Sequence, residues 1–589
     1  MENQTNEIYD THLSKLKLIN AGNASMSKEE FKNMNTEHML SLRKKRGNKN
    51  IDHLKKINLN AQLFNYDIDT MQLILLLQND NLYIKFTSEN DENEKLNYLL
   101  QMLISSDLNV LKFSLIEFKK FINTIRDSNE FSSKNLLNQF NDKMFRFLFN
   151  LLLKNKNEYS NKEDYYQIMI LLCYIVAKLC SFNDFYIGIL FDYFDDLLNL
   201  AKNEQDKNLK NALYIITHKI LLINKIKDDE IFNRKIEEIY QKLFEQIYYE
   251  LIQLNNELNN NKSIFIIKNL YPTLINIISS IIYINNQNNA NKNNNCLINL
   301  KNISHILSFS MQYLSSSFME TEILKSTIHF LGVALNYYKE NKRIFSKESN
   351  IEFIEIINKI KIDKHIISYI YDNSMNDYDF INEIIEMINN MLLINNSEFI
   401  NNLIENNICE QISNLQIFIL ENEQENNNTI KQLYKSHIEL IYNLISTQSD
   451  YVIENICIEN SCISNLFQFM NNTIFLYTTD YLRIIEIFDL IIQSKTEYVH
   501  SLLLTEGIYD LYKNILINNL LLMILKDISI MIERGKSFRT SNGINIVSNH
   551  FIVKGILDLI NNIKSRKNID NKIILILDEM PILLNEKTK

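Results

Sequence analysis

Apolar residues recur along most of this chain at the spacing of a helix with one buried face. In residues 431–446, KQLYKSHIELIYNLIS, they fall three and four positions apart, which is the period of an amphipathic helix. Residues 480–494 and 379–394 follow the same pattern over a similar length. We predict a long helix for each of the three segments.

Between the long helices lie shorter apolar segments that share a template. Residues 397–419, 449–470 and 496–516 each carry an apolar residue four or five positions before a turn, then Ile, then Leu or Ile three to four residues apart. Gly507 fits the turn that closes the first helix, where a left-handed backbone costs least for Gly or Asn. Asn407 is expected to take that turn in the earlier copy.

From about Asp67 to Leu584 one unit repeats: a short apolar helix, a tight turn, a second helix and a polar loop. The period of roughly forty residues is that of armadillo and HEAT repeats. We therefore expect an all-α, right-handed superhelical solenoid of eight to ten armadillo repeats over residues 61–589. The long helices would be the third helix of each repeat, which lines the concave groove.

Composition favours the same fold. The chain has 589 residues, more than one hydrophobic core usually supports. It contains only 8 Gly and 2 Pro, whereas average usage would give roughly forty and thirty. Folds rich in strands need Gly and Pro at their turns, so a helical array remains.

Three segments interrupt the helical pattern. The tracts from Asn285 to Asn295 and from Glu421 to Asn428 are of low complexity, and we expect disordered loop insertions there. The longest apolar stretch, Ser263 to Ile284, contains Lys268 and Pro272. We interpret it as a buried helix pair and expect no insertion into a membrane.

Candidate chemistry is sparse. No phosphate-binding loop, nucleophile elbow or zinc-protease motif is present, so we expect no enzymatic activity and no cofactor. The acidic body has no evident basic stripe, which argues against nucleic acid as a partner. The scattered cysteines lack metal-ligand spacing, so we expect no metal site and buried thiols in a reduced, intracellular protein. They are Cys173, Cys180, Cys296, Cys409, Cys457 and Cys462.

Charge divides the chain into a basic arm and an acidic body. Residues 1–60 hold eleven Lys or Arg and seven Asp or Glu, a net charge of +4. Because the whole chain carries −10, residues 61–589 carry −14. A solvated tail or a simple localisation signal would account for such a cluster.

The basic residues of the arm fall into blocks, and the order of these blocks indicates more than a solvated tail. Residues 15–58 resemble the importin-β-binding arm of the importin-α family in three consecutive blocks: Lys-Leu-Lys at Lys15–Lys17, LSLRKKRGNKN at 40–50 and HLKKIN at 53–58. The dense arginine run of the family is replaced by FKNMN at 31–35. The resemblance implies an importin-β-like receptor as partner, bound through Lys15, Lys17, Arg43, Lys44, Lys45, Arg46, Lys49, Lys55 and Lys56.

The same resemblance implies a groove for basic peptide segments of cargo proteins. In the family, Trp and Asn four residues apart on successive third helices hold the peptide, but this chain has no Trp. The matching positions carry Tyr214 and His218, Glu386 and Asn390, and Glu439 and Asn443. A Glu in place of Trp would attract Lys or Arg directly. Two asparagines can also match by chance in so Asn-rich a chain.

Two functions remain open. The resemblance implies a nuclear-import adaptor that links cargo with a basic localisation signal to importin-β, shuttling between cytoplasm and nucleus. The alternative is an armadillo scaffold that binds a dedicated protein partner without general cargo-receptor activity. The ordered blocks of the arm favour the adaptor, whereas the missing Trp array favours narrow specificity.

Overall fold

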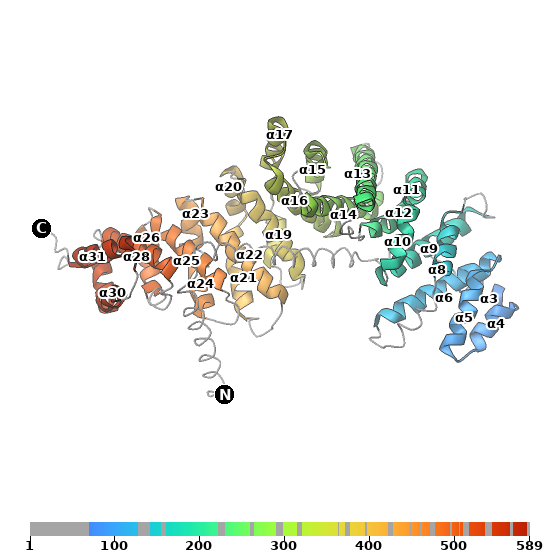
Figure 1. Cartoon of the computed structure of the whole chain (residues 1–589), viewed down its shortest axis with the longest axis horizontal. Helices are drawn as coiled ribbons and strands as arrows, with labels where there is room; N and C mark the ends of the chain where they lie inside the picture. Colours follow the sequence, from blue (N-terminus) through green and yellow to red (C-terminus); the bar gives the residue numbers. More distant parts are fainter. Residues whose placement is uncertain are drawn as a thin grey trace. The chain divides into compact units, whose positions relative to one another are not determined.

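The computed structural model describes most of the chain beyond residue 69, in twenty segments. These are residues 70–127, 142–154, 161–182, 184–221, 230–259, 264–289, 298–314, 321–362, 364–371, 377–394, 397–421, 428–447, 449–459, 462–471, 478–494, 497–505, 507–509, 518–535, 545–565 and 569–585. Within them the secondary structure is helical, and no β-strand is present (Figure 1).

The described helices belong to two compact units, one with residues 70–313 and 321–350 and one with residues 351–585. The first unit is built from α3 (Thr70–Leu77), α4 (Asn81–Ser88), α5 (Glu92–Leu103), α6 (Leu108–Asp127), α8 (Asp142–Leu152), α9 (Lys162–Phe182), α10 (Asp184–Asp192), α11 (Phe194–Asn203), α12 (Lys207–Ile220), α13 (Glu230–Asn259), α14 (Ile264–Asn289), α15 (Leu300–Leu314) and α16 (Thr321–Asn341).

Helix α17 (Lys347–Asn358) spans the division between the units. The second unit continues with α18 (Lys364–Ser368), η3 (Tyr369–Tyr371), α19 (Tyr378–Leu392), α20 (Ser397–Glu405), α21 (Ile408–Glu421), α22 (Asn428–Ile445), α23 (Asp450–Glu454), η4 (Asn455–Glu459), α24 (Cys462–Asn471), α25 (Thr478–Gln493), α26 (Glu497–Thr505), α28 (Asn518–Arg534), α29 (Ile546–Val553), α30 (Ile556–Lys564) and α31 (Asn571–Asn585).

Within each unit the long helices stack in chain order. In the first, α6 packs on α9, α9 on α12, α12 on α14 and α14 on α16. In the second, the same relation joins α19, α22, α25, α28 and α31 (Figure 1). Each long helix buries its apolar face on its neighbours in the series, as solenoid repeats do. This stacking confirms the prediction of an all-α repeat architecture, and the long helices predicted at 379–394, 431–446 and 480–494 are α19, α22 and α25.

Left-handed residues mark the turns between paired helices. Asn407 lies between α20 and α21 with φ 65°, and Gly507 follows α26 with φ 85°. Both were predicted from the repeat template. Gly555, between α29 and α30, has φ 88° and closes a further copy of the template. Only Gly, and to a lesser degree Asn, adopts this backbone conformation at low cost.

Helix α14 corrects two expectations. The stretch predicted as a helix pair is one continuous helix, Ile264–Asn289, with Pro272 inside it. Pro272 removes one backbone hydrogen bond from the helix. The helix stays intact because it packs against α12, α13 and α16, and this packing outweighs the lost hydrogen bond. The tract predicted as a loop from Asn285 begins inside this helix, so Asn285 occupies a fixed helical position.

Helix α9 is the one helix in the described part of the chain that is long and apolar enough to cross a membrane. The segment Lys162–Ser181 has the length and composition of a membrane span, yet 83% of that window is buried inside the protein. It packs against α6, α8, α10 and α12. Its apolar surface is therefore matched by neighbouring helices of the same unit.

Cysteines fill the core as small apolar side chains. Cys173, Cys180, Cys409, Cys457 and Cys462 are free and buried, whereas Cys296 lies outside the described residues. Burial raises the pKa of the Cys173 and Cys180 thiols far above the usual value. Thiols held in this protonated state are poor nucleophiles and poor metal ligands.

Candidate functional site

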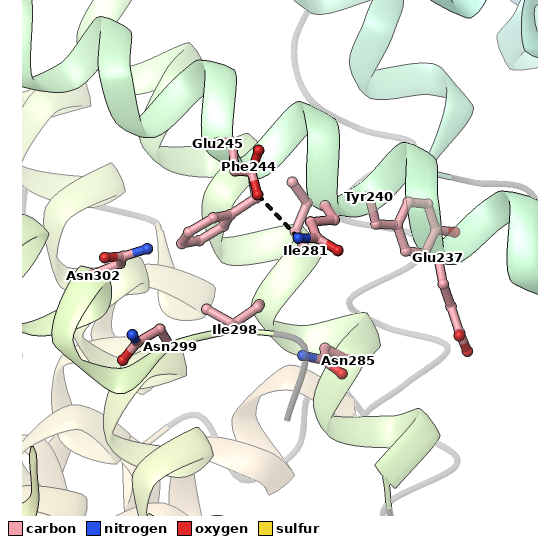
Figure 2. Close-up of a pocket in the computed structure, with 10 residues that line it drawn as sticks. Glu237, Tyr240, Phe244, Glu245, Ile281, Asn285, Ile298, Asn299 and Asn302 are labelled. Atoms are coloured by element: carbon pink, nitrogen blue, oxygen red, sulfur yellow. Dashed lines mark hydrogen bonds between the residues drawn. The ribbon is translucent and has the colours of Figure 1, made fainter. Parts of the chain in front are cut away.

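A pocket opens in the first unit between α13, α14 and the residues that lead into α15 (Figure 2). Its volume is about 170 Å³. The lining combines carboxylates, aromatic rings and amides: Glu237, Tyr240, Gln241, Phe244, Glu245, Ile281, Asn285, Ile298, Asn299 and Asn302. None of these residues was assigned a binding role from the sequence, because they come from three separate segments of the chain whose packing the sequence does not show.

Two features of the pocket wall are fixed by hydrogen bonds. The side chain of Gln241 donates to Glu245 Oε1 at 3.0 Å, one turn further along α13. Asn299 Oδ1 accepts from the backbone N–H of Lys301 at 2.9 Å and so caps the start of α15. By contrast, Asn285 is only 3% exposed and neither its Nδ2 nor its Oδ1 has a hydrogen-bond partner within the protein.

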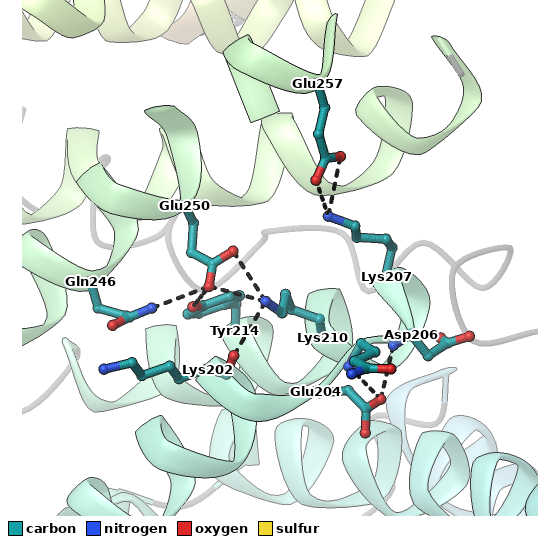
Figure 3. A network of polar contacts seen from close by, with 10 residues as sticks. Lys202, Glu204, Asp206, Lys207, Lys210, Tyr214, Gln246, Glu250 and Glu257 are labelled. Atoms are coloured by element: carbon teal, nitrogen blue, oxygen red, sulfur yellow. Dashed lines mark hydrogen bonds and ion pairs between the residues drawn. The ribbon is translucent and has the colours of Figure 1, made fainter. Parts of the chain in front are cut away.

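Tyr214, predicted to line a cargo groove, lies instead in the interface between α12 and α13 (Figure 3). Its side chain is fully buried, and its hydroxyl donates to Glu250 Oε1 at 3.3 Å. Glu250 also accepts two hydrogen bonds from Lys210 Nζ, at 3.0 and 3.1 Å. Burial and the nearby Glu250 carboxylate raise the pKa of Tyr214 strongly.

This network is an internal ion pair rather than a binding surface. Lys210 and Glu250 have side chains only 8% and 4% exposed, and Gln246 donates a further hydrogen bond to Glu250 at 3.1 Å. A second pair, Lys207 and Glu257, joins the same two helices at 3.2 Å (Figure 3). Charges buried in this way need each other, since leaving one unpaired is costly.

His218, predicted beside Tyr214, is buried as well. Its Nε2 lies 2.9 Å from Ser280 Oγ on α14, and the ring is 3% exposed. Burial, with a smaller contribution from the charge of Lys219, lowers the pKa of His218 to about 3. Tyr214 and His218 therefore present no surface that a groove peptide could contact, and their assignment to the groove is corrected here.

The other predicted positions belong to a polar surface of the second unit. Along α19, α22 and α25, which pack side by side, residues at helical spacing are partly or fully exposed. We call this surface the three-helix face. It comprises Asp379, Glu383, Glu386 and Asn390 on α19, Lys431, Lys435, Glu439 and Tyr442 on α22, and Arg483, Glu486, Asp489 and Leu490 on α25.

The three-helix face carries a surplus of negative charge. Among its twelve residues are six carboxylates and three cations. Exposed like charges on neighbouring helices repel one another and are compensated by cations from solvent or from a partner. The face is therefore suited electrostatically to a basic ligand.

Arg483 forms the centre of this face. Its guanidinium binds Glu439 in a forked arrangement, with Nε 2.9 Å from Oε2 and Nη2 3.2 Å from Oε1. Its Nη1 donates to Glu486 Oε2 at 2.6 Å, and the guanidinium carbon lies 3.9 Å from the centre of the Tyr442 ring. Partial burial alone would lower the pKa of Arg483, but the carboxylates of Glu439 and Glu486 outweigh it and raise that pKa.

The predicted asparagines differ in their surroundings. Asn390 is partly exposed on the three-helix face. Asn443 is only 4% exposed, and its amide donates to Asn389 Oδ1 at 2.9 Å. Asn389 in turn donates to the backbone oxygen of Ser436 at 3.0 Å. Asn443 therefore joins α22 to α19, and its predicted role in binding a peptide backbone is corrected.

The importin-β-binding positions predicted in the arm, Lys15 to Lys56, lie outside the described residues. The only predicted site residues that gather on one exposed surface of the described chain are Glu386, Asn390 and Glu439. Arg483 and Tyr442, which complete the charged cluster, were missed. Their signal in the sequence was the i, i+3 pair of Arg483 and Glu486 on a helix already recognised.

No protein-family model matches this chain, and no curated protein matches it either. Solved structures do show remote likeness in fold. An engineered protein has a TM-score of 0.47 at 11% identity, covering 84% of this chain and 99% of its own. SYS-1 has a TM-score of 0.35 at 10% identity, covering 89% and 99%. Lph2, a bidirectional nuclear transport receptor in S. cerevisiae, has a TM-score of 0.38 at 14% identity, covering 96% of this chain and 57% of its own.

Proposed function

We propose that this chain is a protein-binding solenoid that holds a basic peptide segment on its three-helix face. The observation that carries the proposal is the surplus of carboxylates on that face. They surround the Arg483 cluster, which we define as Arg483 with Glu439, Tyr442 and Glu486. Repeat proteins bind partners along surfaces formed by successive helices. A basic segment would be attracted by the net negative charge of this face.

Arg483 indicates what such a ligand would meet. A guanidinium lies against the Tyr442 ring and is forked onto a carboxylate, an arrangement that suits arginine far better than lysine. Arg483 already fills this position and holds both Glu439 and Glu486. A bound segment would therefore contact acidic groups outside this cluster, Glu386 on α19 and Asp489 on α25. The contacts of the Glu439 carboxylate thus belong to the protein's own arginine.

Charge-neutralising variants test this binding mode. A Lys- and Arg-rich peptide with a fluorescent label is titrated with the full chain at low and at physiological ionic strength. The variant Glu386→Gln/Asp489→Asn should bind about fivefold more weakly, which corresponds to about 1 kcal/mol. The matched control is Glu355→Gln/Glu454→Gln, whose glutamates are exposed elsewhere in the unit. Equal affinity of both double variants would contradict the proposal.

We further propose that the chain acts as a nuclear-import adaptor through its basic arm. Three basic blocks follow one another in the order of an importin-β ligand, and the arm is positive while the rest of the chain is acidic. A basic segment of this kind binds an acidic receptor by charge-assisted hydrogen bonds. The adaptor would then shuttle between cytoplasm and nucleus with its cargo.

The arm is tested in the full chain with importin-β as the probe. Arg43→Ala/Lys44→Ala should reduce importin-β affinity at least tenfold, since a hydrogen bond to a charged group contributes about 1.5 to 3 kcal/mol. Lys342→Ala/Arg343→Ala removes the same two charges from an exposed site on the repeats and serves as the control. If the arm variant bound importin-β as tightly as the control variant does, the proposed adaptor function would be contradicted.

A dedicated scaffold remains the second candidate. Arg483 already neutralises part of the negative charge of the three-helix face. The chain also has no Trp with which to form channels for lysine side chains. Both features favour one specific partner over a range of localisation signals. Comparable affinity for several unrelated basic peptides would exclude this candidate, whereas selection of one would support it.

A further inference from the structure

We propose that the outward surface of α31 is an interface between two copies of this chain, whose α31 helices pack antiparallel across a two-fold axis. This surface shares no residue with the three-helix face. The proposal therefore does not depend on the function proposed above.

Helix α31 carries apolar residues on two sides. Its buried stripe consists of Ile573, Leu577, Met580 and Leu584. On the side turned away from this stripe, Leu575 is 63% exposed and Ile582 is 64% exposed. A surface helix normally has polar residues opposite its buried stripe. These two side chains therefore form an apolar surface that the fold itself leaves uncovered.

The position of α31 explains what kind of element can cover this surface. In the second unit α22, α25 and α28 each pack between two long helices, and α31 ends this series in the described part of the chain. The end of a solenoid is usually covered by a polar outer face. An apolar face in its place suits a further helix, which would continue the stack.

Charge identifies that helix as the α31 of a second copy. Lys572 and Glu579 are exposed on the same side of α31, seven residues or about two turns apart. Neither forms an ion pair with the described residues of its own chain, whereas Asp578 is paired with Lys564. A free cation and a free carboxylate at this spacing are complementary to the same helix running in the opposite direction.

The two-fold axis is placed by this spacing. The midpoint between Lys572 and Glu579 falls between Leu575 and Ile576. In an antiparallel pair crossing there, each Lys572 lies opposite Glu579 of the partner subunit, so symmetry forms the ion pair twice. Between the two ion pairs, each Leu575 packs on Ile576 of the partner subunit. Charge and apolar contacts are thus satisfied by one arrangement.

The geometry also sets the size of the assembly and its strength. An interface that uses the same surface on both copies closes at the dimer. One pair of helices about 22 Å long buries less than the ~1,600 Å² of a standard interface. We therefore expect a dissociation constant on the order of 10 µM.

Sedimentation velocity of the full chain tests for this dimer. Between about 1 and 200 µM the mass should rise from 69.8 kDa toward twice that value. Leu575→Gln should weaken dimerisation at least tenfold, whereas Ile344→Gln, at a side chain 64% exposed in the first unit, should leave it unchanged. A monomer at every concentration, or equal effects of the two variants, would overturn the proposal.

Charge exchange tests the antiparallel arrangement. Lys572→Glu or Glu579→Lys alone places like charges opposite each other twice, and each should weaken dimerisation about tenfold. The double variant Lys572→Glu/Glu579→Lys should restore it, and the two single variants should pair with each other when mixed. Both side chains are exposed, so the unfolding midpoint should not change. Single variants that dimerise as tightly as the unaltered chain would exclude this pairing.

A contact between different surfaces of two copies is the competing arrangement. Helix α3 also exposes apolar side chains, Met71 at 79% and Leu75 at 64%. If α31 bound this helix of another copy, association would not close at two and larger species would form. Met71→Gln/Leu75→Gln should leave the dimer unchanged. Loss of association in that variant, or species larger than a dimer that require Met71 and Leu75, would overturn the two-fold interface.

Discussion

At the scale of single residues, buried histidines make the stability of this protein sensitive to acid. Burial lowers the pKa of His437 to about 4, against a slight opposing effect of the Tyr434 backbone. Burial and the charge of Arg534 likewise lower the pKa of His500 to about 4. In the unfolded chain these side chains would titrate near 6.5. Below that pH the unfolded state binds more protons than the folded state, so stability falls as pH falls.

We predict that His437→Phe reduces this acid sensitivity. Between pH 6.5 and about 4, one neutral buried histidine costs about 1.4 kcal/mol of stability for each pH unit lost. Phenylalanine has a similar volume and does not titrate, so the denaturation midpoint of the variant should depend less steeply on pH in that window. His365→Phe, at an exposed position, is the control. Parallel pH profiles of wild type and His437→Phe would contradict the assignment.

Among the residues assigned to the groove from the sequence, the two glutamates lie where solvent reaches them, whereas three of the uncharged residues are buried. Glu386 and Glu439 carry charges that favour solvent, and both lie on an exposed surface. Tyr214, His218 and Asn443 were assigned to the groove because they match the Trp and Asn positions of the importin-α family, which lie four residues apart on a helix. Such spacing identifies residues on one side of a helix, but either side can be the buried one. Each of these three is buried and hydrogen-bonded to a neighbouring helix.

At the scale of elements, single glycines determine where helices end. We predict that Gly555→Ala destabilises the second unit by about 1 kcal/mol, because an L-residue with a side chain is strained at φ 88°. The nearest atom to the added Cβ would be Asp558 Oδ2 at 3.8 Å, so the cost is conformational rather than steric.

Gly332→Ala provides the matched comparison. Gly332 lies inside α16, where an added Cβ would meet no atom within 4 Å. Alanine is about 1 kcal/mol better than glycine in a helix interior, so this variant should be stabilised. Thermal unfolding of the two variants should shift the midpoint in opposite directions. A gain in stability for Gly555→Ala would show that the turn can be made without a left-handed residue.

The positions of the long helices were predicted well, because the periodicity of apolar residues reflects packing. The breaks predicted within α14 were wrong. The long helices were located to within a few residues, since each repeats its apolar positions over several turns. Pro272 and the asparagines from Asn285 onward suggested breaks on propensity alone. In α14 tertiary contacts with α13 and α16 outweigh those local preferences. The pocket at Asn285 therefore could not be foreseen from a tract that looked like a loop.

At the scale of the whole molecule, the chain combines a basic arm of +4 with an acidic remainder of −14. These opposite signs can be read from the sequence alone, since charge needs no fold to be counted. The pocket and the Arg483 cluster need the fold, because their residues come from different helices. The proposed pairing of basic with acidic groups thus follows from the sequence, whereas the location of the acidic cluster on the repeats needs the structure.

The stacking of the repeats also determines how the loss of stability caused by a core substitution extends along the chain. Phe488 on α25 is fully buried and stacks on Phe467 of α24, with ring centres 4.8 Å apart. Phe488→Ala removes this contact and should cost about 3 to 5 kcal/mol. Because each long helix packs on its neighbours in the series, the loss should pass first to α22 and α28.

Hydrogen exchange resolves this spread along the chain. In Phe488→Ala we expect protection to fall most in α22, α25 and α28, while α9 and α12 in the first unit keep theirs. The matched variant Phe149→Ala removes a buried ring that contacts Tyr193 in the first unit, and it should produce the reverse pattern. If either variant lowered protection equally in both units, the chain would unfold as one cooperative body. Partner binding in one unit would then be coupled energetically to the other.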